Sequence, residues 1–234
     1  MNVLPIWGTM RMLESSCDPV FWTSFLENLY FKGVRHIHSS NEYESFAILT
    51  ECLLILSKKG IVFSHIIKLA EPSFNESKFS AERLLSKIDF YNQMLPGKIE
   101  TIQWMWRSEG LDNERIASFL KQQESLDAAF EKYNICCFPY STNFADKAIE
   151  LKNLNGLIIY WNKFETEYLE SAINASKKNK VNYVLRPFGG AKTKSFSSID
   201  MLSFCKRVPS LRGIIFTATT DEHLNEAIHF FKNI

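Results

Sequence analysis

Two short apolar runs of this chain end in side chains that can move protons. The run 34–39 is followed by Tyr43, five residues after His38, and the run 61–69 carries Lys68 near its end. A phenol can donate a proton to an oxygen that gains charge, and a nearby amine or imidazole can assist that transfer. Tyr43, Lys68 and His38 therefore predict an acid–base site, provided that the two runs are neighbouring strands.

Five further polar or glycine-containing segments follow other apolar runs. They are Gly8-Thr9-Met10-Arg11-Met12, Ser141-Thr142-Asn143, Tyr160-Trp161-Asn162, Arg186-Pro187-Phe188-Gly189-Gly190 and Thr219-Thr220-Asp221. Glycines allow a backbone to approach a phosphate closely, and a helix N-terminus attracts anions. The glycine pair 189–190 is thus a candidate for close approach to a phosphate, although a bare turn explains this pair equally well.

The elements that must position these residues alternate along the chain. Short runs of β-branched and aromatic residues recur about every 25 to 35 residues, and longer amphipathic runs fill the gaps, which is typical of a parallel sheet with crossover helices. The predicted strands are 3–7, 34–39, 61–69, 99–105, 135–140, 156–161, 181–186 and 212–217. The predicted helices are 20–32, 43–59, 81–95, 113–133, 143–154, 166–178, 198–208 and 221–232.

Eight such units favour a closed barrel over an open sheet. We expect one (β/α)₈ TIM barrel domain over residues 1–234, in which the strand C-termini form the active face. Gly33 and Gly60 are suited to helix C-termini, and Thr219-Thr220-Asp221 supplies helix-capping oxygens. The active face would gather Ser39, Tyr43, Lys68, Met105, Ser141, Asn162, Arg186 and Thr217.

Taken in order, these segments resemble the aldo/keto reductase superfamily, over nearly the whole chain from Gly8 to Ile228. The resemblance implies a barrel that holds NADP or NAD across its top and reduces a small carbonyl or sugar substrate. In that family a tyrosine protonates the carbonyl oxygen, a lysine paired with an aspartate lowers the phenol pKa, and a histidine orients the carbonyl. By position, Tyr43 matches the acid and Lys68 the lysine.

Two of the four catalytic positions depart from the family pattern. His38 stands where the family has its aspartate, so Lys68 is expected to lose the opposite charge beside it. The family's histidine falls on Met105 or Trp106, which would line the substrate side, and neither side chain donates and accepts as an imidazole does. We therefore expect a degenerate active site with weak reductase activity.

The resemblance also implies residues that bind the cofactor. They are Ser141, Asn143, Asn162, Arg186, Gly189, Thr219 and His223. Ser141 and Asn143 match the pair that binds the nicotinamide carboxamide, and His223 stands at the basic position for the 2′-phosphate. Ala227 replaces an asparagine that contacts the adenine. NADP binding should therefore be weakened, and NAD, another nucleotide or no cofactor stay open.

The bulk composition excludes several classes of partner. The 27 Lys and Arg residues balance 26 Asp and Glu residues, so neither nucleic acid nor an anionic membrane is an expected partner. The sequence lacks a leader pattern and an apolar stretch long enough to span a membrane, which predicts a soluble, cytoplasmic protein. Its five cysteines, without metal-type spacing, predict reduced thiols and no metal site.

Three functions remain compatible with these residues. The leading interpretation is an NAD(P)-linked oxidoreductase. The first alternative is a catalytically inactive barrel that acts as a binding module, and the second is a non-redox acid–base enzyme, an isomerase or lyase, that uses Lys68, Tyr43 and His38. The fold alone does not choose among them.

Overall fold

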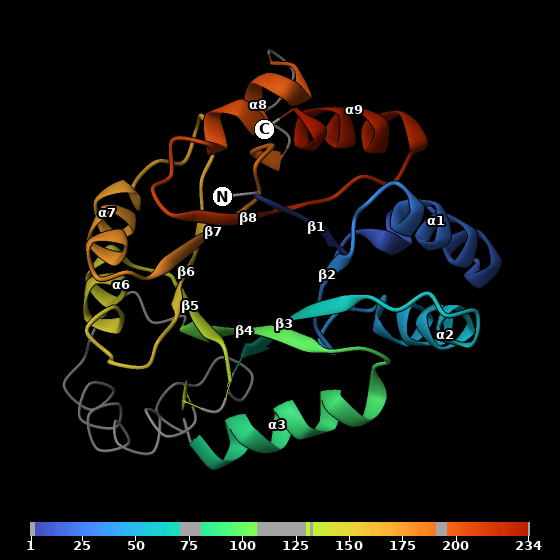
Figure 1. Ribbon diagram of the computed structural model, residues 1–234, viewed down its shortest axis with the longest axis horizontal. Helices are drawn as coiled ribbons and strands as arrows, with labels where there is room; N and C mark the ends of the chain where they lie inside the picture. Colours follow the sequence, from blue (N-terminus) through green and yellow to red (C-terminus); the bar gives the residue numbers. More distant parts are fainter. Residues whose placement is uncertain (1–2, 71–80, 107–129, 132, 191–195, 234) are drawn as a thin grey trace.

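The computed structural model describes residues 3–70, 81–106, 130–131, 133–190 and 196–233. Within these ranges, parallel strands pair in the order of the sequence and close into a barrel (Figure 1). The predicted eight-stranded architecture is confirmed. The strands are β1 (Leu4–Gly8), β2 (His36–Ser39), β3 (Ser64–Ala70), β4 (Ile99–Trp106), β5 (Ile135–Pro139), β6 (Gly156–Tyr160), β7 (Val181–Leu185) and β8 (Leu211–Phe216).

Helices surround the barrel as the alternating pattern predicts. The described helices are η1 (Met12–Glu14, a 3₁₀ turn), α1 (Pro19–Phe31), α2 (Phe46–Lys58), α3 (Ala81–Met94), α6 (Thr142–Ala148), α7 (Leu169–Lys177), α8 (Ser198–Cys205) and α9 (Asp221–Lys232). The predicted helix 113–133 lies almost entirely outside the described residues. Gly33 and Gly60 follow α1 and α2 with φ of 101° and 79°, the left-handed conformation expected of a helix end.

Two helix boundaries differ from the prediction for identifiable reasons. Helix α6 ends at Ala148 rather than near residue 154, because the chain turns there and the buried Lys180 ammonium donates to the carbonyls of Leu151 and Leu154, at 2.9 and 2.5 Å. Helix α2 begins at Phe46, because Tyr43 belongs to a turn in which its N–H donates to the carbonyl of Ser40. Tyr43 is therefore positioned by a turn and not by a helix.

Alternation along the strands separates two apolar layers. Side chains that point inward fill the barrel, while the outward side chains pack with the helices in a larger core. Cys136 and Cys137 illustrate the division, since the first belongs to the interior and the second to the outer core. The interior cluster comprises Ile6, Ile66, Met105, Cys136, Phe138, Ile158, Tyr183 and Ile215.

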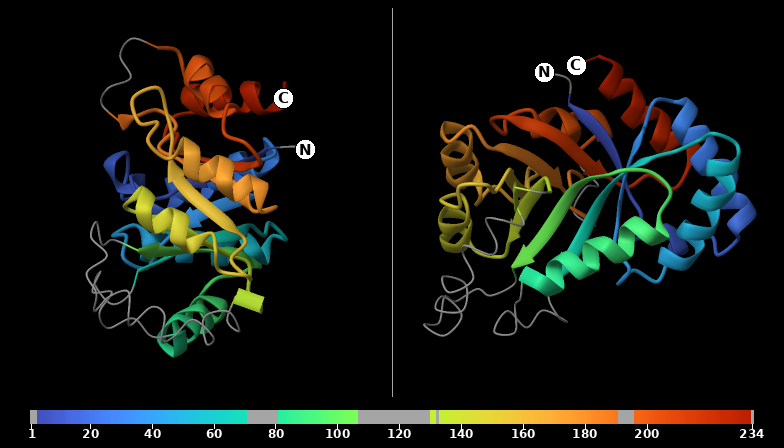
Figure 2. Two further views of the ribbon diagram at one scale, coloured as in Figure 1. Left: turned by 90° about the vertical axis from the view of Figure 1, so that its left-hand side faces the viewer. Right: turned by 60° about the horizontal axis from the view of Figure 1, so that its bottom comes forward.

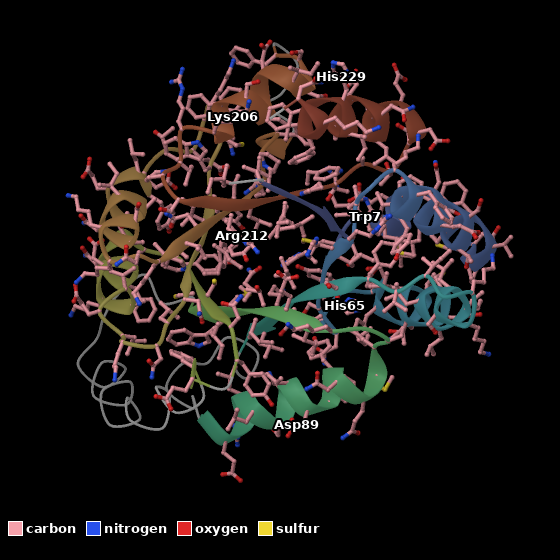
Figure 3. All side chains as sticks on the ribbon, in the orientation of Figure 1. Trp7, His65, Asp89, Lys206, Arg212 and His229 are labelled. Atoms are coloured by element: carbon pink, nitrogen blue, oxygen red, sulfur yellow. The ribbon has the colours of Figure 1, made fainter. Side chains whose placement is uncertain are left out.

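The N-terminal end of the barrel is polar. The His36 Nε2 atom lies 2.7 Å from Glu100 Oε2, and an Arg212 guanidinium nitrogen lies 3.9 Å from Glu100 Oε1. Figure 3 shows Arg212 inside the ring of strands. The hydrogen bond from His36 holds the pKa of Glu100 below its usual range. The ligand-binding chemistry predicted above belongs to the opposite end.

The barrel closes where the two ends of the chain meet. Strand β1 pairs with β8 through four residues, from Leu4 opposite Gly213 to Trp7 opposite Phe216. Both views in Figure 2 place the start of β1 near the end of α9. In the described part of the chain, no helix is both long and apolar enough to cross a membrane.

Gly156 generates a stability prediction. A Cβ atom at this position would lie 1.9 Å from the Val181 carbonyl oxygen, which belongs to the backbone and cannot yield without disturbing the β6–β7 ladder. Gly156→Ala should lower the free energy of unfolding by about 1–3 kcal/mol or more. Urea denaturation measures this change. Gly8→Ala is the control, since its nearest neighbour would lie at 3.3 Å, and equal losses in the two variants would contradict the prediction.

Candidate active site

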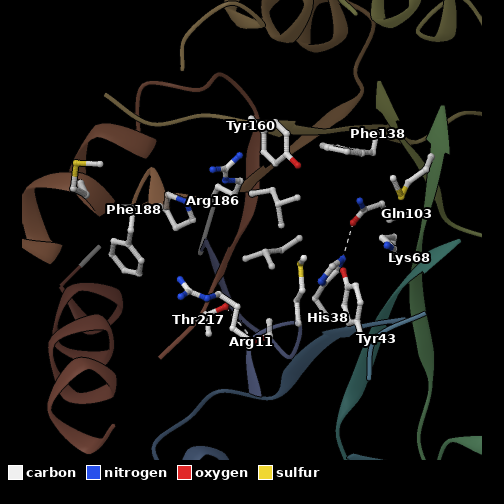
Figure 4. Close-up of a pocket in the computed structure, with 18 of the residues that line it drawn as sticks. Arg11, His38, Tyr43, Lys68, Gln103, Phe138, Tyr160, Arg186, Phe188 and Thr217 are labelled. Carbon is white, nitrogen blue, oxygen red and sulfur yellow. Dashed lines mark hydrogen bonds between the residues drawn. The ribbon is translucent and has the colours of Figure 1, made fainter. Parts of the chain in front are cut away.

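A cavity of about 790 Å³ opens among the C-terminal ends of the strands. Figure 4 shows its two halves, with Tyr43, His38 and Lys68 on one side and Arg11 and Arg186 on the other. Aromatic and aliphatic side chains line the space between them. The lining residues are Gly8, Met10, Arg11, His38, Tyr43, Lys68, Gln103, Met105, Phe138, Tyr140, Tyr160, Leu185, Arg186, Pro187, Phe188, Gly190, Phe196, Ser198, Met201, Ile215, Thr217 and His223.

Lys68 and Tyr43 meet in this cavity. The Lys68 Nζ atom lies 4.7 Å from the centroid of the Tyr43 ring, above its face. Burial, and then the negative charge of Glu42, raise the pKa of the Tyr43 phenol well above its usual range. Tyr43 is therefore a neutral phenol at physiological pH, which can donate a hydrogen bond or a proton.

The charge environment of Lys68 corrects a prediction. We expected that His38, at the position of the family's aspartate, would leave Lys68 without an opposite charge. The structure instead places Glu42 Oε2 3.0 Å from Lys68 Nζ. The carboxylate comes from the turn that carries Tyr43, and the sequence pattern did not indicate it because a charged residue in a turn usually faces solvent.

His38 forms a buried pair with a residue that sequence reasoning missed. Its Nε2 atom lies 2.6 Å from Gln103 Oε1, and both side chains are almost fully buried. Because an amide oxygen only accepts, Nε2 carries the proton. Burial lowers the pKa of His38, the Gln103 hydrogen bond opposes this effect, and the nearby Lys68 charge adds to it, so that the pKa is about 4. His38 is thus neutral at pH 7 and a weak base.

The fourth strand brings Met105 but no imidazole into the site. Met105 is buried and lines the cavity beside Gln103, which lies two residues before it on the same face of β4. Trp104 points the other way, into the outer core. Trp106 ends β4, and its side chain lies outside the described part of the chain. The thioether of Met105 offers a carbonyl oxygen no hydrogen-bond donor.

Two arginines form the other half of the cavity. Arg11 follows β1, and Arg186 follows β7 with φ of 56°, in the left-handed region that an arginine adopts only at a cost of about 1–3 kcal/mol. The Arg186 guanidinium lies 5.0 Å from the Tyr160 ring centroid and 3.5 Å from Glu165 Oε1. Arg11 pairs with Glu14 at the exposed surface. Figure 4 shows both arginines on the side of the cavity away from Tyr43 and Lys68.

Asn162 holds Arg186 in this strained conformation. The fully buried Asn162 amide donates to the Arg186 carbonyl at 3.0 Å and to Glu165 Oε2 at 2.6 Å, while its oxygen accepts the Phe164 N–H at 2.9 Å. The Gly189 N–H also donates to the Arg186 carbonyl. Asn162 therefore directs its hydrogen bonds to the loop, and it does not line the cavity.

The other predicted cofactor residues divide between the cavity and its surroundings. Arg186 and His223 line it, and Gly190 does so rather than Gly189. Ser141, Asn143 and Thr219 are not among the lining residues. Ser141 instead caps α6 by accepting the Phe144 N–H, and Thr220 caps α9 by accepting the His223 N–H. Among the described residues, no group of three or more His, Cys, Asp or Glu is placed to hold a metal ion.

The fold is that of the aldo/keto reductases. Aldose reductase from Giardia lamblia superposes with a TM-score of 0.68 at 12% identity, covering 100% of this chain and 88% of that one. An aldo-keto reductase from Klebsiella pneumoniae in complex with NADPH gives 0.63 at 11%, covering 97% and 85%. The glycerol dehydrogenase of Gluconobacter oxydans gives 0.62 at 15%, covering 97% and 86%. No family model and no curated protein sequence matches the chain.

The buried His38 generates a prediction of pH-dependent stability. Its pKa is near 4 in the folded protein and about 6.5 when unfolded, so the unfolded chain binds the extra proton between these values. Stability that is present at pH 7 should fall as the pH drops from 6.5 towards 4, with a loss of about 2 kcal/mol at pH 5.

Urea denaturation from pH 7 to pH 5 measures this loss. The variant His38→Gln retains a donor towards Gln103 but does not titrate. Between pH 7 and pH 5 its free energy of unfolding should therefore fall by about 2 kcal/mol less than that of the wild type. The exposed His229→Gln is the matched control. Burial also lowers the pKa of His65, and this contribution is common to all three proteins. An identical pH dependence in wild type and His38→Gln would refute the assignment.

Proposed function

We propose that this protein is a divergent aldo/keto reductase, an NAD(P)-linked oxidoreductase of a small carbonyl or sugar substrate. One observation carries the proposal: the Tyr43 phenol and the Lys68 ammonium share one end of a cavity whose other end presents two guanidinium groups. The first end suits a carbonyl oxygen that gains negative charge, and the second suits the phosphates of a dinucleotide. The common fold supports the same conclusion.

The residues on the second side fit such a cofactor. Arg11 and Arg186 would hold phosphate groups, because guanidinium groups bind them with paired hydrogen bonds. Gly190 has φ of 65° and lines the cavity, and among the described residues a Cβ atom added there would meet an Arg186 nitrogen at 3.3 Å. His223, in the first turn of α9, would face a 2′-phosphate. When bound, the nicotinamide supplies hydride.

Tyr43 and Lys68 would handle the proton. The phenol donates a hydrogen bond to the carbonyl oxygen and then its proton, while the Lys68 ammonium stabilises the phenolate left behind. The Phe138 ring lies 5.1 Å from the Tyr140 ring and 5.0 Å from the Tyr160 ring, and the three rings give the cavity an aromatic wall that would limit water near the reacting oxygen. The substrate must therefore be compact, with apolar faces or hydroxyl groups that the two phenols can bind.

The same geometry supports slow turnover. The raised pKa of Tyr43 makes the phenol a weaker acid, and Met105 offers no donor to orient the carbonyl. An electrostatic donor of this kind contributes a factor of about 10²–10³ in other enzymes. These two observations also favour a second candidate function, in which the barrel binds a nucleotide or a carbonyl compound without converting it.

Restoring the missing donor tests the proposed activity. Wild-type protein should reduce generic aldehydes with NADPH at less than about 1 s⁻¹, the lower end of ordinary enzymes. Met105→His should raise kcat/KM at least about tenfold, because an imidazole at the end of β4 can hydrogen-bond the carbonyl oxygen.

Consumption of NADPH, followed by its absorbance, measures both values, and Met105→Leu serves as the control of similar size. A wild-type kcat above about 1 s⁻¹ would contradict the prediction, since the absence of an imidazole at position 105 would then have little effect on the rate. The fluorescence of the five tryptophans reports nucleotide binding. Binding without turnover, in both the wild type and Met105→His, would favour the binding function.

His223 generates a prediction about cofactor selectivity. The 2′-phosphate of NADP adds negative charge, which strengthens binding only if a cation lies beside it. Imidazoles gain positive charge below about pH 7. The preference for NADP over NAD should be small at pH 8 and should grow towards pH 6, while His223→Ala should show no such growth. Fluorescence titrations at both pH values measure this ratio. A strong preference in His223→Ala that does not vary with pH would assign the 2′-phosphate to another cation.

A further inference from the structure

Glu42 occupies a place in the site that the family pattern gives to another element. We propose that Glu42 is the positioning residue of Lys68: it holds the ammonium above Tyr43, the task of a carboxylate at the end of β2 in the related pattern. This inference rests on the proposed function, since it assigns Lys68 and Tyr43 to the proton-transfer site.

The contact is close and is sheltered on the lysine side. Glu42 Oε2 lies 3.0 Å from Lys68 Nζ, and the two side chains are 31% and 13% exposed. The Lys68 ammonium in turn lies over the Tyr43 ring. An ion pair so placed is screened less than one in open solvent, so the carboxylate can hold the ammonium in its place over the ring.

The turn that carries Glu42 is held from two sides. The Ser40 hydroxyl accepts the Glu42 N–H at 3.3 Å, and the Ser40 carbonyl accepts the Tyr43 N–H at 3.1 Å. On the outer side, the Tyr91 hydroxyl of α3 accepts the Asn41 N–H at 2.5 Å and donates to Asn41 Oδ1 at 2.7 Å. Glu42 and Tyr43 are therefore fixed relative to each other, and Lys68 bridges them from β3.

The neighbouring residue on β2 cannot serve the same purpose. His38 is close enough to Lys68 for the ammonium charge to disfavour its protonation, and its Nε2 proton is directed to Gln103. Among the described residues, the ionisable groups with a stated interaction with Lys68 are Glu42, His38 and Tyr43, and of these three Glu42 carries the opposite charge at neutral pH. The carboxylate beside Lys68 thus comes from the turn that follows β2 and not from the end of β2 itself.

Chemical labelling of Lys68 tests this role without any turnover. An amine-acylating reagent must reach the Lys68 nitrogen, so removing the carboxylate that holds this nitrogen should make it easier to attack. At pH 8, Glu42→Gln should be acylated at Lys68 about two- to fivefold faster than wild type, the range expected of a partly exposed ion pair. Peptide mass spectrometry follows the modification, and circular dichroism verifies that each variant is folded.

Matched variants separate charge from structure. Glu44→Gln removes an exposed carboxylate two residues away and should leave the Lys68 rate unchanged, whereas Glu42→Asp should retain part of the protection. Adding His38→Asp to Glu42→Gln returns a carboxylate to the end of β2 and should slow acylation again. Equal rates in wild type, Glu42→Gln and Glu44→Gln would overturn the proposal.

Turnover provides the second readout. If the protein reduces a carbonyl substrate, Glu42→Gln should lower kcat about tenfold and shift its pH profile, with KM largely retained, because the charge acts on proton transfer. An unchanged kcat and pH profile would also overturn the role. Faster labelling of Lys68 in a protein without turnover would refute the proposed function and leave the Glu42–Lys68 coupling established.

Discussion

The pairing of β1 with β8 is the constraint on which the rest of the molecule depends. It closes the parallel ladder and obliges every strand to end at the same rim. Two side chains reinforce the seam, since Trp7 Nε1 donates to the Ala218 carbonyl and Thr217 Oγ1 donates to the Gly8 carbonyl. Because of this closure, Tyr43 and His223 border one cavity although they follow the second and the last strand.

The fold could be predicted from sequence because its signals are local. Apolar runs of strand length, glycines after the helices and the Thr220 cap each depend on a few neighbouring residues, and the strand boundaries agree to within about three residues. The length of α6 could not be predicted in this way. It depends on Lys180, which lies after α7. The Lys180 ammonium donates to the carbonyls of Leu151 and Leu154, which would otherwise accept from backbone N–H groups if the helix continued.

The positions of the candidate site residues could be predicted, but their partners could not. Strand ends place Tyr43, Lys68 and Met105 on the active face, whereas the charge beside Lys68 depends on how one turn folds back over β2. Gln103 stands within an apolar run, and only the β3–β4 register, which sets it opposite Lys68, brings it to the site. Asn162 matches a binding motif, yet its hydrogen bonds go to its own loop and to the Arg186 carbonyl after β7, a pairing that the sequence does not reveal.

The left-handed backbone of Arg186 concentrates conformational strain in the loop after β7. Hydrogen bonds from the Asn162 amide and the Gly189 N–H to the Arg186 carbonyl offset this strain in the folded protein. The Arg186 side chain is therefore already placed at the cavity, and a ligand would not need to reorganise its backbone. The same arrangement makes this loop the place where local opening releases strain while the ladder remains intact. Opening of this loop alone would leave the pairing of β6, β7 and β8 unchanged.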